Sequence, residues 1–406
     1  MTTASHTQSA ATDMGSVVLQ APLQILTGFF FAFRFSLIYI GFQSDPRLGT
    51  FVSVGCSVLL MLVAVVYTLG DKQFSVPFLL ASRTMRWLLL YFAVSFLSLL
   101  WTGADSTMIA AGYWAGMAMD VATVLLLVKQ PAVAHQADAI MKGFVLGVLF
   151  IAAVAWLSPV RDDLRIGNEE FLHPNGIGLH CALAFFLAQH LALKERGWKW
   201  CCLALGITLL RSISKTSIVA FLIAESFYLL RDKQISRQIK IKIAAAAVVV
   251  TAAFGTLLEA YFEIYNTTAG GQFETLTGRT VIWSASLLMA LERPWLGHGI
   301  YSYRALVPMF GTFQPQHAHD ELLQQFFEYG IVGVCIAIGL YVSLILAAKR
   351  SAARRYGKLA LVLVVFCLVH GLTDTVTFGF SLPVWLFAAL ALTLTPAPDS
   401  LQEVNA

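Results

Sequence analysis

The chain has 406 residues, of which 58% are hydrophobic and only 12% are charged, with a formal net charge of +4. A soluble protein would carry about 25% charged residues, so the composition excludes an ordinary soluble enzyme and favours a multi-pass helical membrane protein. All six cysteines fall inside apolar runs and none forms a CxxC pair, which argues against disulfide, redox and zinc chemistry.

Twelve apolar segments follow a polar start. Residues 1–21 lack a basic region ahead of an apolar core, which predicts a disordered tail rather than a cleaved signal peptide. The segments lie near 22–42, 48–70, 87–102, 107–128, 140–158, 175–193, 199–214, 216–230, 241–259, 321–348, 357–373 and 380–396. We therefore predict an all-α integral membrane protein of about 12 transmembrane helices. Segments 1–9 occupy 22–259, one long loop occupies 260–320, segments 10–12 occupy 321–396, and a tail follows at 397–406.

The distribution of positive charge predicts the orientation. Loops after even-numbered segments hold eighteen Lys and Arg residues, whereas loops after odd-numbered segments hold eight. Positive charge is retained in the cytoplasm, so both termini are predicted to be cytoplasmic and the loop at 260–320 extracytoplasmic. Group transfer on that side cannot use cytoplasmic nucleotides, and a lipid-linked donor meets this condition.

A histidine pair ends that loop, at residues 316–333 (QHAHDELLQQFFEYGIVG). Read at helical spacing from His319, one stripe holds Leu322, Leu323, Phe326, Gly330, Gly333 and Ala337, and a roughly opposite one holds Glu321, Gln325 and Glu328. The small residues of the first stripe would let another helix approach closely. His319 stands at the helix N-terminus, where the helix dipole favours a neutral imidazole and a nearby anion. A neutral base beside an anion site is a catalytic arrangement, and His317 is expected to support it.

Three cations are predicted to lie on the same side as His319. Arg279 lies in TGRTVIW, and Arg211 and Lys215 lie in RSISKTS. A cation near membrane depth needs a partner, and the pyrophosphate of a lipid would satisfy several together. The alternative is that these side chains anchor segment ends by reaching the interface.

Two turn segments carry further candidates. Residues 293–303 (RPWLGHGIYSY) contain Trp295, Tyr301 and Tyr303, which would either stack on sugar rings or anchor the chain at the interface. Residues 173–178 (HPNGIG) open the sixth segment, where Asn175 would either cap the helix or contact a donor.

Other patterns are weak. Ser212 to Lys215 matches S-x-x-K, but the partner motifs of acyl-serine enzymes are absent. HAHD offers two histidines and one acid, and no other cluster completes a metal site, so no metal or other cofactor is expected. Intramembrane Arg34, Asp120 and Glu225 would suit an ion path, but they are scattered and no inverted repeat is visible.

These motifs resemble those of the O-antigen ligases and their polymerase relatives. His319-Asp320 followed by Gly330-x-x-Gly333 is similar to the family signature, although Asp320 replaces the usual Asn, Ser or Gln. Such a carboxylate would either raise the basicity of His319 or cap the helix. Arg279 resembles the arginine upstream of the family's histidine, and ERPWLGHGIYSYR resembles the family's turn segment. RSISKTS matches a serine–arginine pair of the family in which Lys215 takes the arginine's place, so either Lys215 or Arg211 would contact phosphate.

The resemblance implies a glycosyltransferase type C-like protein in the bacterial inner membrane. It implies an inverting transfer of a glycan from undecaprenyl pyrophosphate to an acceptor hydroxyl. His319 would be the base, Arg279, Lys215 and Arg211 would hold the pyrophosphate, and neither metal nor nucleotide would be needed. The implied partners are the lipid-linked donor glycan, an acceptor (another lipid-linked glycan or lipid A-core), the bilayer and a chain-length regulator, with no nucleic acid.

Several functions stay open at this point. The combination of HPNG, SKTS and TGR before a tryptophan most resembles the motifs of exopolysaccharide polymerases. A ligase would instead transfer the finished glycan to lipid A-core. Protein O-oligosaccharyl ligases are a third branch. A polysaccharide or lipid transporter without covalent chemistry is the alternative from another class. The sugar, the linkage, the acceptor and the oligomeric state are not specified by the sequence.

Overall fold

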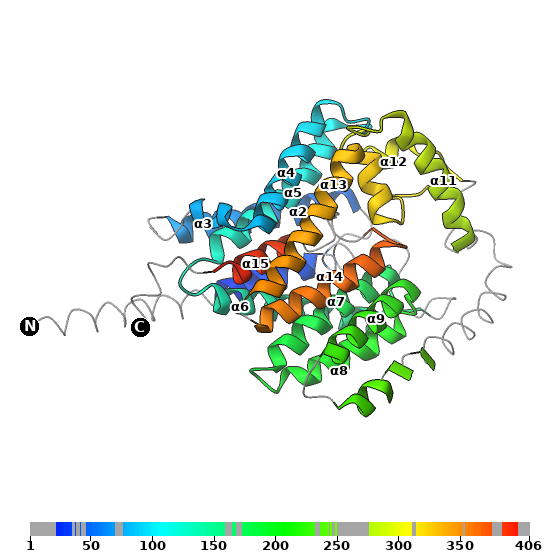
Figure 1. The fold of residues 1–406 in the computed structure, drawn as a ribbon. Coiled ribbons are helices and arrows are strands. Elements are labelled where there is room, and N and C mark those ends of the chain that lie inside the picture. Colours follow the sequence, from blue (N-terminus) through cyan, green and yellow to red (C-terminus); the bar gives the residue numbers. More distant parts are fainter. Residues whose placement is uncertain are drawn as a thin grey trace, which may run out of the picture. The chain divides into compact units, whose positions relative to one another are not determined.

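The computed structural model describes most of the predicted segments (Figure 1). The described residues are 22–34, 37, 41, 46–69, 76–158, 165–167, 173–231, 236–242, 244–245, 248–249, 276–310, 314–351, 354–375 and 384–396. Both predicted tails, most of the ninth segment and residues 260–275 of the predicted loop lie outside this set.

The described residues form helices and contain no strand, which agrees with the predicted all-α class. Residues 22–34 are helical. The labelled helices are α2 (Pro46–Thr68), α3 (Val76–Ala81), α4 (Arg83–Leu97), η1 (Ser98–Leu100), α5 (Thr107–Leu127), α6 (Val133–Leu157), α7 (Pro174–Ala192), α8 (Trp198–Arg211), α9 (Lys215–Arg231), α11 (Leu276–Glu292), α12 (Tyr303–Leu306), α13 (Glu321–Arg350), α14 (Arg354–Gly371) and α15 (Val384–Leu394). Helical residues thus lie within every predicted apolar segment; in the ninth, the few described residues, at 241–242, 244–245 and 248–249, are helical.

Several of these helices suit a bilayer. Five in the described part of the chain are long and apolar enough to cross a membrane, at Phe51–Thr68, Arg83–Leu100, Thr107–Leu127, Val133–Leu157 and Glu321–Arg350. Large apolar side chains are exposed along these helices, which suits contact with lipid better than contact with water. Leu100 and Leu157 are 84% and 87% exposed. The number of twelve crossings stays a prediction. The predicted loop contains helix, because α11 and α12 fall within it.

The chain divides into two compact units. Unit 1 comprises Met1–Leu79, Met119–Ile213 and Ala388–Ala406, and unit 2 comprises Leu80–Ala118 and Ser214–Phe387.

In unit 1, the first helix packs closely on α6. A Cβ on Gly28 would collide with the Ile140 carbonyl, and a Cβ on Gly143 would collide with the Ile25 carbonyl. Glycines at this interface therefore let the two backbones touch. Near the end of the first helix, Arg34 and Asp120 form a buried ion pair at 2.7 Å. Two of the scattered intramembrane charges therefore satisfy each other, as charges at membrane depth must.

In unit 2, α13 is the central helix. It packs against α4, α14 and α11, while α9 packs against α14. A buried apolar cluster joins the start of α13 to the preceding segments; it consists of Ala290, Tyr303, Val307, Ala318 and Phe327. This packing positions the residues that the sequence analysis selected.

Gly330 interrupts α13 with a kink. Its φ of 62° and ψ of −155° lie in a region open only to glycine. The turn segment at 294–299 runs along the kink and takes up its backbone groups. His298 N donates to Phe327 O at 2.9 Å, Gly299 N donates to Glu328 O at 2.8 Å, and Ile331 N donates to Pro294 O at 2.8 Å. Gly330 thus admits a loop, where the sequence suggested a neighbouring helix.

Candidate active site

The histidine loop, residues 317–320, is held by its middle residue. Ala318 is fully buried. Its backbone N–H donates to Gln324 Oε1 at 2.7 Å, and its carbonyl accepts from Trp283 Nε1 of α11 at 2.9 Å. Because both backbone groups of Ala318 are bonded, His317 and His319 project from a fixed point.

His319 does not enter the helix. Its φ of 52° is left-handed, which is unusual for a non-glycine residue and typical of strained functional sites. The N-cap of α13 is Asp320, whose side chain accepts from Leu323 N at 2.8 Å. Of the two roles that the sequence allowed for Asp320, the structure supports helix capping.

Another carboxylate, from the turn after α14, meets the histidines. Asp374 Oδ1 lies 3.5 Å from His319 Nδ1 and 3.6 Å from His317 Nδ1. The rings of His317 and His319 lie 4.2 Å apart, centroid to centroid. The distance to His319 exceeds a formed hydrogen bond, a looseness common in catalytic groups before substrate binds.

The electrostatics of this cluster favour an ionised Asp374 beside a neutral His317. Burial alone would raise the pKa of Asp374. The neighbouring imidazoles of His319, His317 and His370 outweigh burial and hold this pKa well below its usual range. Burial, with the charge of a protonated His319 added, lowers the pKa of His317 to about 3. Asp374 is therefore ionised at neutral pH, and His317 is neutral.

The hydrogen bonds also indicate which nitrogen of His317 carries the proton. The backbone N–H of His319 donates to His317 Nδ1 at 3.3 Å, so that nitrogen is an acceptor and Nε2 carries the hydrogen. In His319, Nδ1 faces the Asp374 carboxylate, which favours a proton on Nδ1 and leaves Nε2 as the base.

The same turn after α14 also meets the predicted cations. Arg279, only 8% exposed, donates through Nη1 to the carbonyl of Thr373. The Thr373 hydroxyl donates to Thr216 Oγ1 at 3.1 Å, in the first turn of α9 beside Lys215. One residue therefore connects the segments that carry Arg279 and Lys215. Arg211 ends α8 in unit 1, so its role with phosphate stays a prediction.

The serine-rich start of α9 is bonded rather than reactive. Ser217 Oγ lies 3.1 Å from His370 Nε2 of α14 and accepts from Ser214 Oγ at 2.9 Å. These three side chains are buried and fix α9 against α14, directly before the turn that carries Asp374.

The three aromatic candidates differ in exposure. Trp295 is 73% exposed. Tyr301 is partly buried, with Arg304 stacked 4.8 Å above its ring centre. Tyr303 is only 1% exposed, and its hydroxyl lies 2.6 Å from Ser286 Oγ. The predicted glycan contact of Tyr303 is therefore wrong for this conformation, because its ring belongs to the core.

The start of α7 also differs from its prediction. His173, rather than Asn175, caps the helix, because its Nδ1 accepts from the backbone N–H of Asn175 at 3.3 Å. The Asn175 side chain instead accepts from Arg165 Nη2 at 2.6 Å.

The histidine loop with Asp374 offers a set of metal ligands that the sequence did not reveal. One ligand atom from each of His317, His319 and Asp374 lies within 4.8 Å of the others. Two histidines and a carboxylate are a common ligand set for divalent transition metals. The acid of HAHD, Asp320, caps α13, and the third ligand is Asp374 instead.

Asp374 is the main residue that sequence reasoning missed. It follows the eleventh predicted segment, and charge parity predicts that the loop after that segment lies on the same side as His319. An acid at that position was therefore detectable. Its contact with the histidines was not, because pairing of distant loops depends on how α13 and α14 pack.

Apolar helices here hold a His–Asp pair near a buried arginine, an arrangement suited to group transfer with an anionic leaving group. Residues 200–338, about a third of the chain, match a family model described as O-antigen ligase. The match includes Arg279 and the histidine loop, and it confirms the resemblance to the O-antigen ligase and polymerase superfamily. With the apolar helices, it marks the chain as an O-antigen ligase-like membrane protein of polysaccharide biosynthesis. No curated protein matches the chain.

Proposed function

We propose that the protein is an inverting glycosyltransferase that moves a glycan from undecaprenyl pyrophosphate to an acceptor hydroxyl on the outer face of the inner membrane. The observation that carries this proposal is the placement of His319 against Asp374, beside the Arg279 segment. Base and anion site are thereby combined in the region that matches the O-antigen ligase family.

The reaction begins with proton transfer to His319. Nε2 takes the proton of the acceptor hydroxyl while the oxygen attacks the anomeric carbon of the donor. The bond from that carbon to the pyrophosphate oxygen breaks, and the pyrophosphate leaves with the electron pair. Asp374 stabilises the imidazolium that forms. General-base assistance of this kind contributes about 10²–10⁴-fold.

The cations act on the leaving group. Negative charge grows on the pyrophosphate as the glycosidic bond breaks, so fixed cations favour the transition state over the ground state. Arg279 offers a planar guanidinium suited to phosphate oxygens, and Lys215 and Arg211 are its proposed partners. Neutral His317 supplies a hydrogen bond through Nε2.

Charge parity supports an outward-facing site. We place both termini in the cytoplasm and the His319 loop in the periplasm of a bacterial inner-membrane protein.

Polymerisation of exopolysaccharide or O-antigen repeat units is the favoured reaction, because the motifs HPNG, SKTS and TGR resemble those of the polymerase branch. A chain-length regulator is a proposed partner. Ligation to lipid A-core would use the same residues with another acceptor. A transporter would need no base, and the His–Asp pair disfavours it.

The test uses purified protein in lipid with a lipid-pyrophosphate-linked repeat unit as the sole substrate. Wild type and His319→Ala are compared on a gel that resolves chain length. A ladder from wild type that the variant loses supports a polymerase. Product that forms only when lipid A-core is added supports a ligase. Absence of transfer by folded wild-type protein under both conditions refutes the proposal and favours the transporter.

A further inference from the structure

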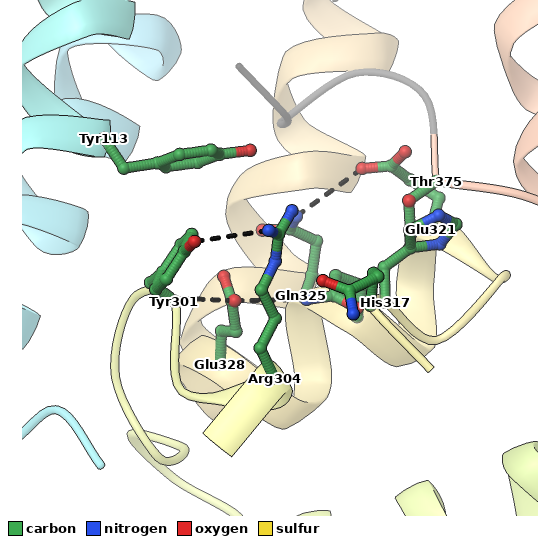
Figure 2. A pocket seen from close by; sticks show the side chains of 10 residues that line it. Tyr113, Tyr301, Arg304, His317, Glu321, Gln325, Glu328 and Thr375 are labelled. Atoms are coloured by element: carbon green, nitrogen blue, oxygen red, sulfur yellow. Dashed lines mark hydrogen bonds between the residues drawn. The ribbon is translucent and has the colours of Figure 1, made fainter. Parts of the chain in front are cut away.

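A pocket of about 110 Å³ opens beside the histidine loop (Figure 2). At roughly 10–15 Å³ per water molecule, it holds about eight waters, which is the scale of one sugar ring rather than of an oligosaccharide. All of its lining residues belong to unit 2, and most of them carry polar side chains. The function stated above assigns no role to this pocket.

One side of the pocket is aromatic. The rings of Tyr113 and Tyr301 lie 5.1 Å apart, and Arg304 stacks on Tyr301 while donating to its hydroxyl at 3.2 Å. Aromatic faces rimmed by planar polar groups suit a sugar, which presents C–H groups on its faces and hydroxyls at its edge.

Carboxylates and carboxamides of α13 also line the pocket, and Glu328 among them lies beside Tyr301 (Figure 2). Glu328 Oε1 accepts from the backbone N–H of Tyr301 and from Gln324 Nε2, both at 3.1 Å, which fixes its orientation. Gln325 is only 2% exposed, and its Oε1 has no hydrogen-bond partner among the described residues. A buried carbonyl without a partner is costly, and a ligand hydroxyl would satisfy it.

The pocket is connected to the candidate base through His317. His317 lines it, and the His317 ring lies 4.2 Å from that of His319. Gln324 also lines it and accepts from Ala318 N–H in the middle of the histidine loop at 2.7 Å. A hydroxyl of a sugar held here would lie beside His317, whereas Arg279 contacts the Asp374 turn through Thr373.

We propose that this pocket binds the acceptor's terminal sugar and selects against an acidic one. The inference rests on the proposed function and adds the substrate class of that same site. Glu321 and Glu328 offer two carboxyl groups against the single guanidinium of Arg304, which already stacks on Tyr301. A uronic acid would bring a third carboxyl group beside Glu321 and Glu328, and a sugar without an acid group would not.

The experiment separates acceptor from donor. The donor is the lipid-pyrophosphate-linked repeat unit, and the acceptor is the same repeat unit as an alkyl glycoside, which cannot donate because it lacks pyrophosphate. The variants are Glu328→Gln, which keeps the shape and one accepting oxygen, and Gln325→Leu, which removes the unpartnered carbonyl at similar volume. Glu292→Gln, the same change at an exposed position of α11, is the matched control.

Gln325→Leu and Glu328→Gln each remove one accepting oxygen from the pocket. We expect each variant to raise the acceptor KM about tenfold and to leave the donor KM unchanged. Oxidising the acceptor's primary hydroxyls to carboxylates should abolish its use by wild type. Unchanged acceptor KM in both folded variants, or a rise of the same size in Glu292→Gln, overturns the acceptor assignment. Equal use of the oxidised acceptor overturns the charge selection. Absence of any transfer by wild type refutes the proposed function itself, a separate outcome from these.

Discussion

His319 Nδ1 faces Asp374 Oδ1 at 3.5 Å, although the two residues come from opposite ends of a pair of packed helices. His319 precedes α13, and Asp374 follows α14. Because α13 and α14 pack against each other, the start of one lies beside the end of the other. His319 and Asp374 are therefore positioned by the packing of α13 against α14.

Asp374→Asn should reduce the transfer rate by about 10²–10⁴-fold with little change in either KM. An amide cannot stabilise the imidazolium, and it can hold His319 in the wrong tautomer. The measurement is steady-state transfer by purified protein.

Asp320→Asn is the matched control for this prediction. Asparagine caps a helix about as well as aspartate, so the rate should fall at most a few-fold. If Asp320→Asn were as damaging as Asp374→Asn, the acid next to His319 in sequence would be the important one, and the assignment of Asp374 would be wrong.

The stability of the protein should fall as the pH drops from neutral toward 4. The pKa of His317 is lowered from 6.5 to about 3 in the folded chain, so between these values the unfolded chain binds more protons than the folded chain. Stability therefore rises with pH across this window and is lost on acidification. The depressed pKa of Asp374 acts in the same direction below its ordinary value of 3.8.

Thermal unfolding in detergent between pH 7.5 and 4.5 tests this dependence. His317→Gln, which cannot be protonated, should show a shallower decline in melting temperature than wild type. Identical slopes for the two proteins would mean that His317 titrates normally in the folded state.

The sequence predicted the helical segments well because each one is apolar over a full helix length. Its failures involve residues whose surroundings come from elsewhere in the chain. Tyr303 was predicted to be an aromatic residue at the membrane interface or on a sugar ring. It lies in the core, because α12 turns its side chain toward Ser286. Gly330 was expected to meet a helix but meets a loop. Glu328 was placed on a polar face, and its role in a pocket depends on the turn at Tyr301.

Gly330→Ala should abolish both folding yield and activity. Its backbone conformation excludes a side chain, and a Cβ there would collide with the backbone of Trp295. Relief of that clash would move the turn segment off α13 and break its hydrogen bonds to the kink. The readouts are the amount of monodisperse protein after purification and its melting temperature.

Gly112→Ala provides the comparison for that substitution. A Cβ at Gly112 would meet nothing within 4 Å, and alanine is the better helix former in α5. This variant should purify and melt like wild type. A Gly330→Ala protein that does the same would show that the kink is not needed.

Zinc should inhibit transfer reversibly, while chelators should leave the basal rate intact. His317, His319 and Asp374 present three ligand atoms within 4.8 Å, so an added transition metal would bind there and occupy the base. Transfer is measured with EDTA alone, with Zn²⁺, and with Zn²⁺ followed by EDTA. His317→Gln weakens the ligand set and should raise the inhibitory Zn²⁺ concentration. Loss of activity in EDTA alone would instead make the cluster a functional metal site and remove His319 from the role of free base.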